Sequence, residues 1–297
     1  MDIYTLDLNF QNVPRAIASY LILAPGGPVL VETGPGATLP TLLEKMASHG
    51  LSPQDIRHVL VTHIHFDHAG AAGWWAQQGA QVYVHHIGAR HLINPSRLIA
   101  SASRIYGEMM DVLWGDILPA ATDKITAVYD GDAIKVAGLT FTALDTPGHA
   151  RHHHVFRLGD LAFTGDAAGI RLPGASFIDL PAPPPEFDLE VWQATLERLL
   201  QEKFAIIYPT HFGRVDDVHG QLEGFKQLVG DAAAFVHDRM QAGISRDDLV
   251  HEYTEWNRAR GRAAGVSDEV IHQYETANPL YMSVDGMMRY WRKRDEQ

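Results

Sequence analysis

The sequence predicts an α/β fold with a helical C-terminal extension, and three observations support this fold class. Strand-like and helix-like stretches alternate through the first third of the 297-residue chain. Residues 124–163 then have a mostly β-type pattern, interrupted by turn-forming pairs such as Asp130-Gly131 and Gly159-Asp160. Beyond about His219 only helical periodicity remains. We therefore expect an α/β domain at residues 1–218 and a helical extension at residues 219–297.

The individual elements follow from hydrophobic periodicity and from turn residues. Ile17–Leu23 and Val29–Thr33 are short β-prone stretches, and the intervening Pro25-Gly26-Gly27-Pro28 favours a hairpin turn. Apolar residues recur with a helical period in Thr38–His49, and Gly50 follows as a C-cap. The same criteria predict strands at Ile56–Thr62, Gln81–His85 and Ala205–Tyr208, and helices at Ala69–Gln78, Leu189–Phe204, Leu222–Met240, Arg246–Arg260, Val270–Glu275 and a segment ending in Arg289–Arg294.

Composition excludes several classes of protein. The formal net charge of −12 argues against a nucleic-acid partner, because a surface that follows phosphates needs basic patches. The absence of Cys excludes disulfides, thiolate metal sites and a cysteine nucleophile. Met1–Phe10 lacks the profile of a signal peptide, and apolar stretches such as Ile17–Leu23 are too short to span a membrane. We therefore expect a soluble, cytoplasmic protein without a membrane partner.

Histidine is abundant and unevenly distributed. The chain has 17 His, and 12 of them lie between His49 and His154. The densest segment is Thr62-His63-Ile64-His65-Phe66-Asp67-His68, which follows a predicted strand and precedes a predicted helix. Two His spaced two apart at the end of a strand point to the same face and can chelate one cation. Asp67 and His68 follow in the turn, so this loop can supply ligands for two neighbouring metal ions.

At this point the sequence resembles the metallo-β-lactamase superfamily, whose signature is H-x-H-x-D-H. The segment from His63 to His68 carries that signature. Further matching segments follow the family's order over roughly residues 15–215, namely Val31-Glu32-Thr33-Gly34, Thr146-Pro147-Gly148-His149, Thr164-Gly165-Asp166 and Pro209-Thr210-His211.

The resemblance implies a four-layer αββα sandwich of two mixed β-sheets, with a binuclear metal centre at one edge. It implies that a first metal ion is bound by His63, His65 and His149. It assigns a second ion to Asp67, His68 and His211, with Asp166 bridging the two. We expect two divalent ions, with Zn²⁺ as the first choice and Fe or Mn as alternatives, since imidazoles and carboxylates suit all of them.

The sequence departs from the family pattern at several positions. Glu32 replaces the more usual Asp. We interpret Glu32 as a residue that lies behind the metal ligands, so this replacement leaves the ligands themselves unchanged. Without Cys, the site is unlike that of β-lactamases that use a Cys ligand, and with His65 it is unlike that of diiron oxidoreductases that have Glu there. Gly169 stands three residues after Asp166, where acyl-homoserine lactonases often have Tyr. This departure argues against a lactonase of that kind.

Other conspicuous residues have two interpretations each. His152, His153 and His154 can form a polar strand edge, or one or two of them can face the metal site. His85-His86 can lie at its rim, and Trp74-Trp75 favours core packing. Gly34-Pro35-Gly36 lacks the Lys and the glycine spacing of a phosphate-binding loop.

The resemblance favours a dinuclear metal-dependent hydrolase. Two cations lower the pKa of a bridging water towards ~7, which makes a hydroxide nucleophile available. Asp67 would orient this hydroxide and receive its proton. The expected substrate is a small molecule with an ester, thioester, lactone or phosphoester bond.

Two functions from other classes remain open. One is a mononuclear iron oxidoreductase resembling the persulfide dioxygenases of the same superfamily, although the complete set of Asp67, His68 and His211 argues against it. The other is a non-catalytic binding module on a degenerate site, although none of the expected ligands is missing.

The helical extension follows His211 within about ten residues, so we expect it to lie near the metal site. Its end is rich in Met and aromatic residues, which suit a pocket wall or a partner surface; these are Tyr281, Met282, Met287, Met288, Tyr290 and Trp291. We expect the extension to line the substrate pocket and to contribute to a homodimer interface.

Overall fold

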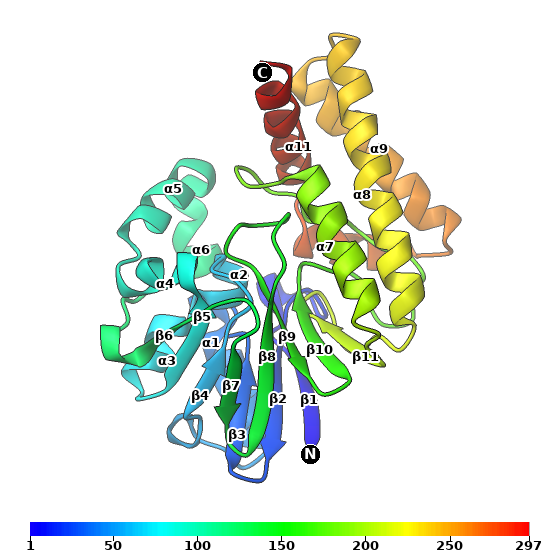
Figure 1. The fold of residues 1–297 in the computed structure, drawn as a ribbon. Coiled ribbons are helices and arrows are strands. Elements are labelled where there is room, and N and C mark those ends of the chain that lie inside the picture. Colours follow the sequence, from blue (N-terminus) through cyan, green and yellow to red (C-terminus); the bar gives the residue numbers. More distant parts are fainter. Residues whose placement is uncertain (297) are drawn as a thin grey trace.

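Two mixed β-sheets face each other in the computed structural model, which describes residues 1–296 (Figure 1). The first sheet has the order β1-β2-β3-β4-β5-β6, with β1 at Asp2–Asp7, β2 at Ala18–Ala24, β3 at Gly27–Val31, β4 at His58–Leu60, β5 at Gln81–His85 and β6 at Ile125–Val128. The second has the order β11-β10-β9-β8-β7, with β7 at Ala133–Val136, β8 at Leu139–Asp145, β9 at His154–Leu158, β10 at Leu161–Gly165 and β11 at Ile206–Pro209. Strands β3 to β6 and the pair β10–β11 are parallel, and the other pairs are antiparallel.

The space between the sheets is filled by side chains that alternate along the strands. Tyr20 on β2 packs against Phe163 on β10, with ring centroids 5.4 Å apart. Val31 and Leu60 from the first sheet lie in the same buried cluster as Phe156 from the second. Burial of this apolar surface holds the sheets together, and it fixes the relative position of the loops that leave their strands.

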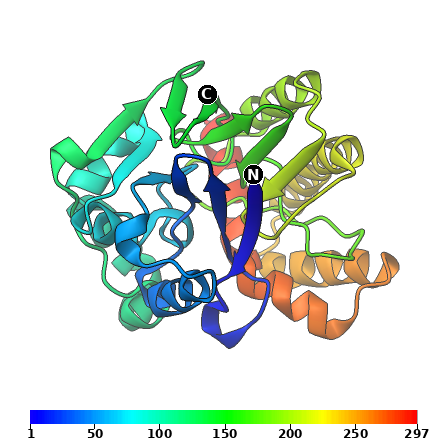
Figure 2. The same ribbon diagram turned by 90° about the horizontal axis from the view of Figure 1, so that it is seen from below.

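Helices cover the outer face of each sheet. A cluster of buried residues joins the first sheet to α1 (Leu39–Ser48), α3 (Ala72–Gln77), α4 (His86–Ile93), α5 (Ser96–Tyr106) and α6 (Met110–Trp114). A second cluster joins the other sheet to α7 (Leu189–Gln201), α8 (Val218–Gln241), α9 (Arg246–Ala263) and α11 (Leu280–Asp295). Seen from below, the blue to cyan helices and the yellow to orange helices lie on opposite sides (Figure 2). The predicted four-layer sandwich with C-terminal helices is therefore confirmed.

The C-terminal helices continue the outer layer of the second sheet. Helix α8 begins after Asp217, whose Oδ1 accepts a hydrogen bond from the Gly220 N–H. Phe225 on α8 packs against Trp192 on α7, with ring centroids 5.4 Å apart. The last residue of the predicted extension, Gln297, lies outside the described residues.

Several predicted elements differ in extent, and some were missed. The hairpin at residues 18–31 and the strand Gln81–His85 form as predicted. The expected helix Ala69–Gln78 forms instead as two short helices, α2 (Phe66–Ala69) and α3. Strand β1 was not predicted, because it lies at a sheet edge and buries only Leu6. Helices α4 to α6 were also not predicted. Together with α10 (Asp268–Ala277), they line the candidate site described below.

Candidate metal centre

The loop between β4 and α3 carries the four residues of the histidine-rich segment. Strand β4 ends at Leu60 and not at Thr62 as predicted, so His63 and His65 lie in the loop and not directly at the end of the strand. Helix α2 starts at Phe66 and carries Asp67 and His68 on its single turn. The compact loop still directs all four side chains to one place, because the short helix reverses the chain directly after His65.

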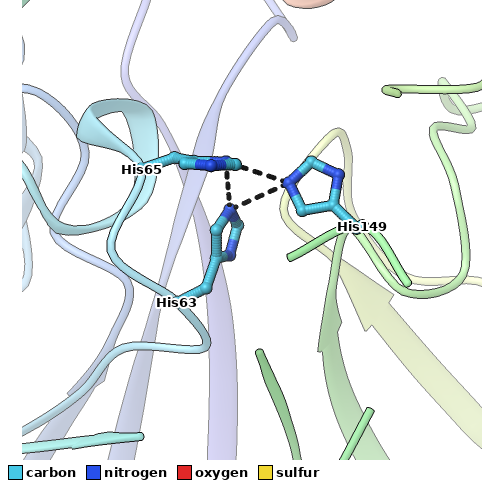
Figure 3. A group of neighbouring side chains, drawn as sticks. All are labelled: His63, His65 and His149. Carbon is cyan, nitrogen blue, oxygen red and sulfur yellow. Dashed lines mark hydrogen bonds between the residues drawn. The ribbon is translucent and has the colours of Figure 1, made fainter. Parts of the chain in front are cut away.

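Three imidazoles meet in the first of two ligand groups (Figure 3). His63 Nε2 lies 3.0 Å from His65 Nδ1, and His149 Nε2 lies 3.2 Å and 2.9 Å from these two atoms. His149 comes from the second sheet, in the turn between β8 and β9. The turn is tight at Gly148, which has φ of +131° and would place a Cβ 2.4 Å from the Trp192 Cα.

The second group contains both carboxylates. Asp67 Oδ2 lies 3.4 Å from His68 Nε2 and 3.4 Å from His211 Nε2. Asp166 lies between the groups, because its Oδ2 is 3.3 Å from His149 Nε2 and its Oδ1 is 3.4 Å from His68 Nε2. The structure thus brings together all seven residues for which the resemblance implied a ligand role.

Hydrogen bonds behind two histidines fix which nitrogen faces the centre. His149 Nδ1 donates to the Pro181 carbonyl at 2.8 Å, and His211 Nδ1 donates to the Ala16 carbonyl at 2.6 Å. Each bond requires the proton on Nδ1, so in the neutral ring the Nε2 lone pair points to the centre. This arrangement is typical of histidine metal ligands.

The polar atoms of the centre fit divalent cations better than they fit one another. Among residues 1–296, His68 Nε2 and Asp166 Oδ1 are buried without a hydrogen-bond partner. Such atoms are costly unless something else pairs with them. Neutral imidazole nitrogens and carboxylate oxygens are the donor set that zinc, iron and manganese prefer. The residues present therefore fit bound metal ions.

The electrostatics of the centre lead to the same conclusion. Burial, followed by the neighbouring His149, lowers the pKa of His65 to about 3. Burial raises the pKa of Asp67, but His68 and His211 outweigh it and hold that pKa well below its usual value. Burial lowers the pKa of His68, but Asp67 and Asp166 raise it well above its usual value. Three imidazoles next to ionised carboxylates therefore attract positive charge to this place.

Glu32 lies behind the ligands, as predicted. It is buried directly after β3, and its Oε1 is 3.6 Å from His68 Nδ1, on the side of that ring away from the centre. The same oxygen accepts hydrogen bonds from the Thr62 N–H at 3.3 Å and from the Thr210 hydroxyl at 3.4 Å. Glu32 thus links the loops that carry His63 and His211.

The three consecutive histidines have different surroundings. His153 is buried next to the centre, where its Nε2 accepts a hydrogen bond from the Asp166 N–H at 3.2 Å. His152 faces the cavity in front of the centre, and its Nε2 lies 3.3 Å from Glu186 Oε2. His154 belongs to a separate group. Two of the three therefore lie beside the site, in agreement with the second of the two interpretations.

That separate group joins the two sheets. His85 Nε2 donates to Asp145 Oδ1 at 2.8 Å, and His85 Nδ1 accepts from the Ile87 N–H at 3.1 Å. His154 Nε2 lies 4.0 Å from the same carboxylate oxygen. Since His85 uses both ring nitrogens in hydrogen bonds, we interpret this group as a polar contact between β5, β8 and β9.

Trp75 is fully buried, as predicted, while Trp74 is half-buried.

A cavity of about 630 Å³ opens directly onto the centre, and five of the seven clustered residues line it. Helices α4 to α6 form one wall, which includes Ile105 and Met109. This wall was not predicted, although Leu98, Ala102 and Ile105 have helical spacing and would have indicated it.

The C-terminal extension forms part of the opposite wall, as predicted. Residues 276–279 together with Tyr281 and Met282 line the cavity. The prediction of a Met-rich surface is wrong, however, because Met287 and Met288 are buried in the chain's own core. These Met side chains lie on the face of α11 that packs against the second sheet's helical layer. The homodimer stays a prediction that light scattering in solution can test.

Two residues of the extension hold the segment that supports His149. Ser283 Oγ donates to the Leu180 carbonyl at 2.8 Å and accepts from the Ala182 N–H at 3.1 Å. Asn278 Nδ2 donates to the same Leu180 carbonyl at 2.9 Å. All these groups are buried. The residue between them, Pro181, carries the carbonyl that binds His149.

No helix within residues 1–296 is long and apolar enough to cross a membrane. The cytoplasmic location stays a prediction.

Comparisons with known proteins agree with this architecture. A structure of a metallo-beta-lactamase family protein from Thermus thermophilus superposes with a TM-score of 0.71 at 22% identity, covering 99% of this chain and 94% of that protein. A metallo-beta-lactamase fold-containing protein of Sulfurisphaera tokodaii is 29% identical over 162 residues, which are 53% of this chain and 61% of that protein. An atrochrysone carboxyl ACP thioesterase of Aspergillus fumigatus is 24% identical over 245 residues, 82% of this chain and 47% of its own length.

A match to the profile of a whole family agrees with these pairwise similarities. The sequence profile of the metallo-beta-lactamase superfamily matches residues 12–211, which include all seven clustered residues from His63 to His211. The chain therefore belongs to the metallo-beta-lactamase superfamily.

Proposed function

We propose that the protein is a dinuclear metal-dependent hydrolase that acts on ester-type bonds of a small molecule. The observation that carries the proposal is the pair of adjoining ligand groups, with Asp166 between them and a cavity in front. The first ion would be held by His63, His65 and His149, and the second by Asp67, His68 and His211. When bound, two such ions supply Lewis acidity and a hydroxide nucleophile at neutral pH.

The chain's own residues supply the proton acceptor. Asp67 lines the cavity, and the low pKa that His68 and His211 impose keeps its carboxylate ionised at neutral pH. An ionised carboxylate at this place can orient a nucleophilic water molecule and take up its proton. The Nδ1 hydrogen bonds of His149 and His211 keep the Nε2 atom of each ring directed at the centre.

The relatives favour bonds of the carboxylic ester class. A thioesterase is among the proteins that align with most of this chain, although the alignment spans less than half of that relative. Thioesters and oxygen esters share the electrophilic carbonyl that a metal-activated hydroxide attacks. We therefore rank thioesters and carboxylic esters above lactones and phosphoesters.

The test combines metal analysis with a substrate screen. Purified protein is assayed for bound metal and then for hydrolysis of an ester, a thioester, a lactone and a phosphodiester. Asp67→Asn should lower kcat by about 100-fold or more while the protein stays folded. Asp145→Asn, which changes a carboxylate outside the cavity and outside the two ligand groups, is the matched control.

Two results would overturn the proposal. Full activity of Asp67→Asn removes its role as proton acceptor. Binding of a single iron ion with oxygen consumption on glutathione persulfide would favour the oxidoreductase hypothesis instead.

A further inference from the structure

We propose that the cavity binds a large apolar acyl group, so that the substrate is an ester or thioester of a medium-chain carboxylic acid. This inference rests on the proposed hydrolase function and names its substrate class. In the reaction, the C–O or C–S bond breaks, the hydroxyl of water joins the acyl carbon and the proton passes to the leaving group. The side chains of Ile105 and Met109 then set the preference for acyl length.

The cavity is continuous with the metal centre. His65, Asp67 and His149 form the inner end of the cavity, so a carbonyl placed at the centre has its substituents inside the same space. The volume of about 630 Å³ is in the range that encloses a drug-sized ligand. An acetyl group would leave most of this volume filled with water.

The chemistry of the walls also favours an apolar ligand. One wall offers Leu98, Leu113 and Trp114, and the opposite wall offers Met282 and several prolines. Within the described residues 1–296, Arg90 and Glu186 are the charged side chains of the lining outside the centre. Burial lowers the pKa of His91, so its side chain is neutral near pH 7. Such a lining suits an apolar group better than a sugar or a phosphate.

Apolar surface is left exposed at the rim of the cavity. Ile105 is 45% exposed and Met109 is 47% exposed, and both line the cavity. Ile87 at the same rim is exposed to a similar degree. Exposed apolar side chains that line a cavity are typical of a ligand-binding groove. An acyl chain that extends from the centre would cover them.

The experiment measures kcat/KM of the zinc-loaded protein on p-nitrophenyl esters from acetyl to decanoyl. Each added methylene should raise kcat/KM about fourfold until the cavity is filled, since that is the effect of burying one methylene. The double variant Ile105→Gln/Met109→Gln should lower the ratio of octanoyl to acetyl kcat/KM at least about tenfold.

Val112 supplies the matched control. It is 64% exposed and lies close to Met109 in sequence, but it does not line the cavity. Val112→Gln removes the same kind of exposed apolar side chain and should leave the chain-length ratio unchanged. An equal effect of both substitutions would overturn the assignment of Ile105 and Met109.

A binding measurement without turnover separates this inference from the proposed function. Octanoate should bind more tightly than butanoate in calorimetry, and the double variant should lose that difference. If esters are cleaved with no dependence on acyl length and the two acids bind alike, the acyl site is wrong and the hydrolase stands. If none is cleaved but octanoate is still preferred, the acyl site stands and the hydrolase function fails. A higher kcat/KM for octyl acetate than for ethyl octanoate would overturn the assignment to the acyl side.

Discussion

The carbonyl oxygen of Pro181 accepts a 2.8 Å hydrogen bond from Nδ1 of His149 and so determines which nitrogen of that ring faces the centre. Pro181 belongs to the segment that connects β10 to α7. Ser283 on α11 binds the residues on both sides of it. The extension is therefore connected to the metal centre through only two hydrogen-bonded steps.

We predict that Ser283→Ala weakens zinc binding about tenfold, the lower end of the effect seen for groups that orient ligands. Without the hydroxyl, the Ala182 N–H loses its partner and the Pro181 carbonyl is free to shift. Competition with a chromophoric chelator measures the dissociation constant. Ser283→Thr, which keeps the hydroxyl, should restore binding. Ser176→Ala removes a different hydroxyl that reaches the extension, at Ala264, and should have no effect on affinity. Unchanged affinity in Ser283→Ala would contradict this connection.

A second prediction concerns the close approach of α11 to the same segment. A Cβ at Gly286 would lie 1.9 Å from the Ala182 carbonyl oxygen, so Gly286→Ala forces the helix away from the loop. We expect the free energy of unfolding to fall by about 2 kcal/mol. Gly230→Ala on α8 is the control, because its Cβ would meet nothing closer than the flexible Gln193 amide at 3.4 Å. Equal stability of the two variants in urea titrations would refute the steric argument.

The third prediction is a metal-dependent melting temperature. Zinc at about 100 times its dissociation constant should raise the melting temperature by about 5 °C, because it binds only the folded chain. A chelator should reverse the shift. Asp166→Asn should abolish it, since Asp166 lies between the two ligand groups. Asp145→Asn alters the hydrogen-bonded group around His85, outside the centre. Zinc should raise the melting temperature of this variant as much as it does for the wild type.

The fourth prediction is a pH dependence that comes from His154. Burial, followed by the nearby His85, lowers its pKa from 6.5 to about 3, while Asp145 and Asp130 oppose this shift. The folded state therefore keeps His154 neutral, and the unfolded state takes up a proton as the pH falls below 6.5. Its contribution to stability is complete above pH 6.5 and is lost as the pH falls towards 3.

We expect this group to remove about 1 kcal/mol of unfolding free energy per pH unit below 6.5. His154→Phe fills the same buried space next to Phe156 and carries no titrating group, so its stability should fall less between pH 6.5 and 5.5. Urea titrations at the two pH values measure the difference. The same substitution at the exposed His219, which does not contribute to the shift of His154, should leave the wild-type slope. Parallel slopes for wild type and His154→Phe would rule out this origin.

The sequence allowed prediction of much of the fold because local signals agreed with the final packing. The spacing from His63 to His68 indicated clustered ligands, and the matching segments extended the cluster to His211. The helical and β-strand periodicities of the apolar residues predicted most of the helices and strands that form the layers. These signals depend only on residues near one another in the chain.

What could not be predicted depends on long-range packing. The burial of Met287 and Met288 follows from the position of α11 on the second sheet's helical layer, which no local pattern contains. The hydrogen bond from His149 to Pro181 joins residues 32 apart. Strand β1 exists because its backbone pairs with β2, and its own side chains gave little hydrophobic signal.

The ligands come from both sheets, and this has a consequence for the order of folding. His63, His65, Asp67 and His68 follow a strand of the first sheet, whereas His149, Asp166 and His211 are carried by the second. A complete centre therefore exists only after the two sheets have docked, late in the assembly of a chain with many distant contacts. Metal should then leave the rate of folding almost unchanged and act mainly by slowing the separation of the sheets. The ions would therefore stabilise the folded sandwich and would not direct its formation.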